Sequence, residues 1–240
     1  MRHRLTALRS RLGWSLWIPA FYWWATYAMR TVLTVVARWK VTGRDRVPRE
    51  GAVIVVSNHL NNIDPPVIAA AIAKRRVRFM AKIELFKWPF GIVPRLYGAF
   101  PVRRFESDIA AMLNAERVLK RGQVLGMFPE GTRSRTGFIG RPHPGTAMIA
   151  LRSGATVLPC AITGSEQLGN PLNVLRQPKI TVTIGVPIPL TAVRRPTEAQ
   201  VNELTDRIFA EITAMLPPKY LPPNTGSEEQ AADGGDPPGD

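Results

Sequence analysis

Short apolar runs alternate with segments of helical periodicity after residue 50. A short uninterrupted apolar run bounded by turn residues is typical of a buried strand, and apolar residues three or four positions apart are typical of a helix. Strands that alternate with helices predict an α/β domain, here a mixed sheet flanked by helices. The predicted strands are 52–57, 77–81, 99–102, 124–128, 156–162 and 180–184, and the predicted helices are 64–73, a broken helix at 86–96, 108–121, 145–152 and 197–216.

Helix boundaries follow from capping residues. Asp64 stands before Pro65 and Pro66, a sequence that favours Asp64 as the N-cap of a helix with proline in its first turn. Thr197 has the same role at the last helix, and Gly122 and Gly154 suit helix ends.

The first 39 residues have a different pattern. Residues 12–29 form an uncharged and mostly apolar run that contains Pro19, and Arg30 separates it from a second apolar stretch at 31–37. We interpret this as two helical pieces that lie in or dip into one leaflet of a bilayer. A single spanning helix is one alternative, although the run is short for it. A signal peptide is another, with a weak cleavage site at 26–28.

Charge supports the membrane interpretation. The net charge is +14, and residues 1–49 hold ten Lys and Arg against Asp45 alone. A cationic segment needs an anionic partner, and the tryptophans beside it favour an anionic lipid surface over nucleic acid. We therefore expect a membrane-associated protein at the cytoplasmic face of the plasma membrane, with an anchor at 1–39, an α/β domain at 40–216 and a disordered acidic tail at 217–240. The oligomeric state stays open.

His59 follows a predicted buried strand and precedes a predicted helix. A side chain in that position reaches into the cleft at the end of a sheet. Neutral imidazole can take a proton from a hydroxyl, and a carboxylate on its other nitrogen fixes the tautomer. Asp64, five residues on, can supply that carboxylate if the chain turns between the two. The alternative for His59 is an ordinary loop histidine, and the alternative for Asp64 is a helix N-cap.

Three further segments carry candidate chemistry. In 128–134 (Phe-Pro-Glu-Gly-Thr-Arg-Ser), Gly131 permits an unusual backbone conformation or the close approach of a ligand, and Arg133 suits binding of a phosphate group. The alternative for this segment is a polar surface turn. In 98–104, Arg103 and Arg104 can supply a second phosphate contact or be solvated surface residues. In 157–161, Pro159 within an apolar strand predicts an edge or a bend, and Cys160 is an ordinary core thiol. No cluster of metal ligands is visible in the sequence, so no metal is expected.

These four segments, in this order, resemble those of the glycerolipid acyltransferases, in particular bacterial 1-acylglycerol-3-phosphate acyltransferases. The matching blocks are Asn58 to Asp64 (Asn-His-x4-Asp), Gly98 to Arg104, Phe128 to Ser134, and Val157 to Ala161. The resemblance covers about residues 40–190. It implies phospholipid biosynthesis by acyl transfer, with His59 as general base and Asp64 orienting it. It also implies substrate binding, which we assign to Asn58, Arg103, Arg104, Glu130, Gly131, Thr132 and Arg133.

The resemblance further implies direct transfer of an acyl chain from a thioester, acyl-CoA or acyl-carrier protein, to the free hydroxyl of 1-acylglycerol-3-phosphate, giving phosphatidic acid without a cofactor. Glycerol-3-phosphate or another lysophospholipid is an alternative acceptor. A non-catalytic membrane-binding protein on the same fold is an alternative of another class, as is nucleic-acid binding through the basic N-terminus. Phe86, Trp88 and Phe90 are candidates for an acyl-chain channel, with ordinary core packing as the alternative.

Overall fold

The computed structural model describes residues 20–87, 91, 94–95, 97–103, 108–134, 136–169, 173 and 176–223. The predicted α/β fold with a mixed sheet flanked by helices is confirmed. The strands are β1 (Arg38–Thr42), β2 (Val53–Ser57), β3 (Val77–Lys82), β4 (Phe100–Val102), β5 (Val124–Met127), β6 (Thr156–Thr163) and β7 (Lys179–Ile184). The helices are an N-terminal helix at 20–36, α2 (Asp64–Ile72), α4 (Ile109–Lys120), α5 (Gly145–Ser153) and α6 (Glu198–Ala214), with short 3-10 turns at Arg44–Arg46, Ile83–Phe86, Ser165–Gly169 and Pro218–Tyr220.

The sheet has seven strands in the order β1-β7-β6-β2-β5-β3-β4. Only the β6–β7 pair is antiparallel, so β1 and β7 run opposite to the other five strands. β2 lies in the middle, with Ser57 opposite Cys160 of β6 and Val56 opposite Met127 of β5. The carboxyl ends of β2, β5 and β6 therefore meet at one edge of the sheet, where ligands bind in open α/β sheets.

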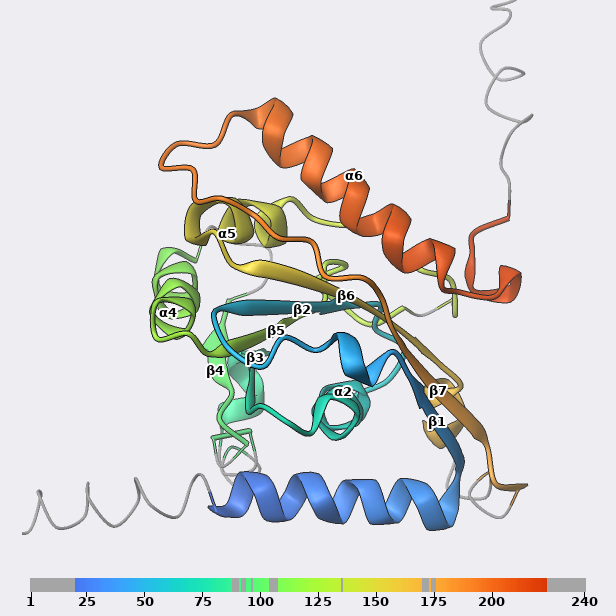
Figure 1. The fold of residues 1–240 in the computed structure, drawn as a ribbon. Coiled ribbons are helices and arrows are strands. Elements are labelled where there is room, and N and C mark those ends of the chain that lie inside the picture. Colours follow the sequence, from blue (N-terminus) through green and yellow to red (C-terminus); the bar gives the residue numbers. More distant parts are fainter. Residues whose placement is uncertain are drawn as a thin grey trace, which may run out of the picture.

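Helices cover both faces of the sheet (Figure 1). α2 lies between one face and the N-terminal helix, while α5 and α6 cover the other face and α4 packs against α5, β4 and β5. The alternation of side chains along β2 explains the two cores: Val53 and Val55 face α2, and Ile54 and Val56 face α5 and α6. The five residues of β2 are all buried, as expected for a central strand of a parallel sheet.

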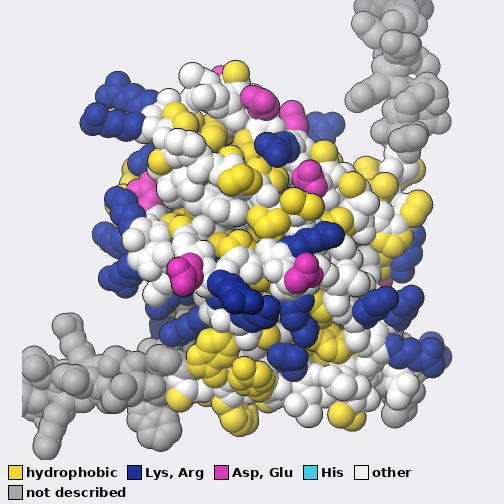
Figure 2. Space-filling model, in the orientation of Figure 1, with side chains coloured by type: hydrophobic (Ala, Val, Ile, Leu, Met, Phe, Trp, Pro, Cys, Tyr) yellow, Lys and Arg dark blue, Asp and Glu magenta, His cyan; other side chains and the backbone are white. Residues whose placement is uncertain are grey.

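The N-terminal helix is continuous from residue 20 to 36. The predicted division at Arg30 is therefore wrong, because a half-buried arginine does not by itself interrupt a helix. The part of the first predicted piece (12–29) that precedes residue 20 lies outside the described residues. Tyr22, Thr26 and Leu33 are buried against the domain. Trp24, Tyr27, Val32 and Val35 are exposed, and Figure 2 shows apolar side chains gathered along this helix. Among the helices that the structure describes, none is long and apolar enough to cross a bilayer.

The domain predicted at 40–216 extends further than expected at both ends. Strand β1 begins at Arg38, inside the predicted anchor, and pairs with β7. At the other end, Pro218–Tyr220 forms a 3-10 turn in the predicted disordered tail, and Tyr220 is buried. Residues 224–240 lie outside the described residues.

Two local predictions need correction. Asp64 is the first residue of α2 rather than its N-cap, which is Ile63, because the carboxylate turns back to the preceding loop. Pro159 does not mark an edge strand, since β6 lies between β2 and β7. Pairing with β7 stops at Cys160–Ile184, and the Gly185 N–H donates to the Pro159 carbonyl at this break. The predicted cap at Thr197 is confirmed, and Asp108 caps α4 in the same way, each side chain accepting a backbone N–H of its helix.

Candidate active site

Three loops at the carboxyl edge of the sheet form the candidate site. The loop at 58–63 follows β2, the loop at 128–134 follows β5, and the Ser165–Gly169 turn follows β6. The first two loops are joined directly, because the Ser134 N–H donates to the His59 carbonyl at 2.8 Å. Two of the four segments that the sequence singled out therefore lie side by side in the fold.

His59 and Asp64 form a buried pair. Nδ1 of His59 lies 2.9 Å from Oδ2 of Asp64, and the same oxygen accepts the backbone N–H groups of Leu60 at 2.6 Å and Asn61 at 2.7 Å. Asp64 is fully buried and His59 is 5% exposed. An oxygen that accepts two backbone N–H groups carries no proton, so the Nδ1 atom of His59 is the donor of the third bond. In the neutral imidazole this tautomer leaves the lone pair on Nε2, which is the state that a general base requires.

Glu130 joins the backbone of His59 to that of Gly140. Its Oε1 accepts the His59 N–H at 2.8 Å, and its Oε2 accepts the Gly140 N–H at 2.9 Å. Burial raises the pKa of Glu130 from 4.5 to about 7, against the lowering effect of these two hydrogen bonds, and Asp64 adds to the rise. Glu130 is 5% exposed and directed at the backbone. Its carboxylate therefore holds the backbone of His59 in place rather than facing the site.

The imidazole of His59 is also held by a ring. Phe128 stacks on it with 4.1 Å between ring centroids and 18° between planes, and Phe79 of β3 backs Phe128 at 6.1 Å. Together with Asp64, this stacking leaves the ring few alternative orientations. The sequence singled out Phe128 only as part of a motif. Its contact with the His59 ring joins the ends of β2 and β5, which are far apart in the sequence.

Gly131 turns the loop that carries Arg133. Its φ is 66°, a left-handed conformation that favours glycine, and a Cβ here would lie 3.1 Å from the exposed His143 ring. Thr132 and Arg133 follow it on the surface, exposed to solvent beside the His59 loop. These side chains are available to a ligand. His143 is a loop residue, and its N–H donates to the Pro129 carbonyl.

Asn58 and Asn61 connect the His59 loop to β6 and the turn after it. Nδ2 of Asn58 donates to the Ile162 carbonyl at 2.9 Å, and Oδ1 accepts the Ile162 N–H at 2.8 Å. Nδ2 of Asn61 donates to the Ser165 carbonyl at 3.1 Å. The contacts of Asn58 are thus structural, and its predicted contact with substrate stays a prediction. Asn61 was missed, because nothing in its local sequence indicates a partner 104 residues away.

The remaining predicted residues are less fully described. Arg104, Trp88 and Phe90 lie outside the described residues. Arg103 is exposed, and its N–H donates to Asp108 at 2.8 Å. Phe86 is half-buried beneath the Arg95 guanidinium, 5.5 Å from the ring centroid. Cys160 is fully buried, which raises the pKa of its thiol, as expected for a core residue.

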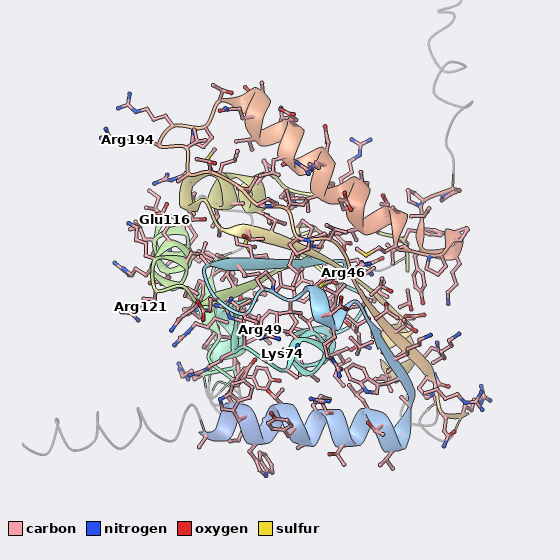
Figure 3. All side chains as sticks on the ribbon, in the orientation of Figure 1. Arg46, Arg49, Lys74, Glu116, Arg121 and Arg194 are labelled. Atoms are coloured by element: carbon pink, nitrogen blue, oxygen red, sulfur yellow. The ribbon has the colours of Figure 1, made fainter. Side chains whose placement is uncertain are left out.

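Three of the basic residues labelled in Figure 3 lie at the other edge of the sheet. Arg49, Lys74 and Arg121 are exposed and precede β2, β3 and β5, so they lie at the amino ends of these parallel strands. The candidate site and this basic edge are therefore separate surfaces.

Comparison with known proteins identifies the family. A family model described as "Acyltransferase" matches residues 38–163, a range that holds the His59 loop, the Glu130 loop and β6. The chain belongs to the acyltransferase family.

Individual relatives of the acyltransferase agree with this assignment. The 1-acyl-sn-glycerol-3-phosphate acyltransferase of Borreliella burgdorferi is 31% identical over 179 residues, which cover 73% of this chain and 70% of that protein. The protein of the same name from Bacillus subtilis is 26% identical over 70% of this chain and 82% of its own length. The crystal structure of the 1-acyl-sn-glycerophosphate (LPA) acyltransferase PlsC from Thermotoga maritima superposes with a TM-score of 0.60 at 26% identity, covering 83% of this chain and 81% of that one.

Proposed function

We propose that this acyltransferase moves an acyl chain from a thioester donor, acyl-CoA or acyl-carrier protein, to the free hydroxyl of 1-acylglycerol-3-phosphate. The observation that carries the proposal is the buried His59–Asp64 pair at the carboxyl edge of the sheet, with Nδ1 engaged and Nε2 left as a base. The names of the relatives from Borreliella burgdorferi, Bacillus subtilis and Thermotoga maritima support this acceptor.

In the proposed reaction, Nε2 of His59 takes the proton of the acceptor hydroxyl as its oxygen attacks the thioester carbonyl. The C–O bond forms, the carbonyl becomes a tetrahedral oxyanion, and collapse of this intermediate breaks the C–S bond. The leaving thiolate takes the proton back from the imidazolium, so the histidine returns to its starting state. Asp64 stabilises the imidazolium while it exists. Backbone N–H groups near Gly131 are candidates to stabilise the oxyanion.

The acceptor phosphate is assigned to the exposed residues beside the pair. Arg133 offers planar paired donors that match phosphate oxygens, and Thr132 adds a hydroxyl on the same loop. Arg103 and Arg104 are the second candidate contact. Glycerol-3-phosphate and other lysophospholipids carry a phosphate too, so these arginines do not distinguish between acceptors.

We place the enzyme on the membrane, at the cytoplasmic face of the plasma membrane, through the N-terminal helix. The acceptor is an amphiphile that resides in a bilayer, so a cleft held at the leaflet reaches it without extraction into water. The exposed apolar side chains of the helix, Trp24, Tyr27, Val32 and Val35, support this arrangement. Phe86, Trp88 and Phe90 stay candidates for the acyl-chain path.

A test is a panel of acceptors against a panel of thioester donors, with positional analysis of the product. We expect phosphatidic acid from lysophosphatidic acid, and loss of this product in His59→Ala. Activity of His59→Ala close to wild type would overturn the mechanism, and preference for glycerol-3-phosphate or another lysophospholipid would change the acceptor. Vesicle binding without any transfer would favour the non-catalytic alternative. An unchanged circular dichroism spectrum and Tm for His59→Ala would exclude unfolding as the cause of its inactivity.

A further inference from the structure

Tyr220 lies at the end of the described C-terminal segment, far in sequence from the candidate site, yet its polar atoms bond to two loops around His59. Its hydroxyl accepts the Gly164 N–H at 2.8 Å and donates to Oε1 of Glu166 at 2.9 Å. Its backbone carbonyl accepts the Ile139 N–H at 2.8 Å. Tyr220 is 3% exposed and packs in the core between the sheet and α6.

The first path runs from the Tyr220 hydroxyl to the carboxylate of the pair. Gly164 precedes Ser165, whose carbonyl accepts from Nδ2 of Asn61. The Asn61 N–H donates in turn to Oδ2 of Asp64, the oxygen that holds Nδ1 of His59. The tyrosine hydroxyl thus fixes the turn against which the His59 loop is held.

The second path runs from the Tyr220 carbonyl to the backbone of His59. Ile139 precedes Gly140, whose N–H donates to Oε2 of Glu130, while Oε1 of Glu130 accepts the His59 N–H. Both paths consist of buried or half-buried groups, where hydrogen bonds are directional and costly to break.

We propose that Tyr220 is a positioning residue for acyl transfer, its hydroxyl acting through the Ser165 turn and Asn61 to hold His59 and Asp64 in their reactive geometry, while its backbone carbonyl ties the same segment to the Glu130 loop. The inference rests on the proposed function of the His59–Asp64 pair. It gives the C-terminal segment a role in the reaction, whereas the family match ends at residue 163.

The test compares Tyr220→Phe with Tyr22→Phe in the full-length chain, assayed in detergent with lysophosphatidic acid and an acyl thioester. Tyr22 is a matched control, because it too is buried and its hydroxyl accepts a backbone N–H, that of Val77, at 2.9 Å. Both variants leave one buried N–H without its acceptor, and Tyr220→Phe also removes the donor to the half-buried Glu166 carboxylate, so we expect Tm to decrease in both. At a temperature well below both Tm values, we expect kcat to fall about tenfold in Tyr220→Phe with KM little changed, and kcat to be unchanged in Tyr22→Phe.

Asn61→Ala tests the first path from its other end. If Tyr220 acts through Asn61, adding Tyr220→Phe to Asn61→Ala lowers kcat by less than about twofold further, because the path is already cut. Equal kcat values for Tyr220→Phe and Tyr22→Phe would overturn the inference, as would full additivity with Asn61→Ala. His59→Ala is measured in parallel: if it stays active, the proposed function fails, and if it is inactive while Tyr220→Phe matches wild type, only the positioning role fails.

Discussion

Oδ2 of Asp64 holds both the ring of His59, at 2.9 Å from Nδ1, and the backbone N–H groups of the two residues that follow it. One oxygen thereby fixes the tautomer of the imidazole and the path of the loop that carries it. The five-residue separation works because the chain turns between the two residues and α2 begins at Asp64 itself. A helix running through both residues would point the two side chains apart.

Asp64→Asn should separate the effect of the negative charge of Asp64 from the effect of its shape as a hydrogen-bond acceptor. The amide keeps one oxygen that can accept the loop N–H groups, but it removes the negative charge that stabilises the imidazolium. We expect kcat to fall by at least about 100-fold with a small change in KM, as in other histidine–carboxylate pairs. Steady-state kinetics measure this, with Asp206→Asn as a control for loss of an exposed carboxylate on α6. A kcat near the wild-type value would assign Asp64 a purely structural role.

The features that could be predicted from the sequence are local ones. The strands of the central sheet are continuous apolar runs, and α4 and α6 have capped amphipathic patterns, so their positions were predicted within a few residues. Strand β1 was missed because it lies at the edge of the sheet, where exposed Arg38 and Lys40 alternate with half-buried Trp39 and Val41. Its pairing with β7 joins residues far apart in the sequence, and no local pattern encodes that.

The same distinction holds for the candidate site. His59, Asp64 and Glu130 were found because they lie in compact motifs. Asn58 pairs with Ile162 across 104 residues, and Tyr220 stands among the prolines of a segment that reads as a disordered tail. Such contacts depend on how loops meet in three dimensions, so a single sequence does not reveal them.

Glu130 predicts a pH dependence of stability. Burial raises its pKa in the folded protein from 4.5 to about 7, so the folded state favours the protonated carboxyl. This contribution is fully present below pH 4.5 and is lost as the pH rises through 7. We expect the free energy of unfolding of wild type to decrease by roughly 3 kcal/mol between pH 4.5 and 8, relative to Glu130→Gln.

Denaturant unfolding at several pH values measures this difference. Glu130→Gln cannot titrate at this position, so it serves as the reference for all the other groups in the chain. Its absolute stability will be lower, because an amide has one acceptor for two N–H donors, and only the change with pH is compared. Parallel pH curves for the two proteins would contradict the assignment.

Asn58→Ala distinguishes a structural role from the predicted contact with substrate. The substitution leaves the N–H and carbonyl of Ile162 without partners in a buried strand, so we expect a loss of about 2–4 kcal/mol in the free energy of unfolding. KM for lysophosphatidic acid should stay unchanged at a temperature where the variant is folded. Asn202→Ala, exposed on α6, is the control. A raised KM without loss of stability would instead support a contact between Asn58 and the acceptor.

The exposed face of the N-terminal helix is the surface through which we expect the enzyme to bind lipid. Trp24 and Val35 are 68% and 70% exposed, and burial of each in a leaflet would contribute on the order of 2 kcal/mol. Replacing either by glutamate removes this term and adds a charge that an anionic surface repels. We expect the partition constant onto anionic vesicles, measured by sedimentation, to fall at least about tenfold in Trp24→Glu and Val35→Glu.

Val186→Glu is the matched control, because Val186 is also a highly exposed valine, 61% accessible, that lies after β7 rather than on the helix. It adds the same negative charge, so a general electrostatic effect would weaken its vesicle binding as much as that of Val35→Glu. Binding through the helix instead predicts that Val186→Glu sediments like wild type. Both valine variants should keep wild-type activity on acceptor dispersed in detergent, where no bilayer has to be reached. If Trp24→Glu, Val35→Glu and Val186→Glu all sediment with vesicles as wild type does, another surface binds the membrane.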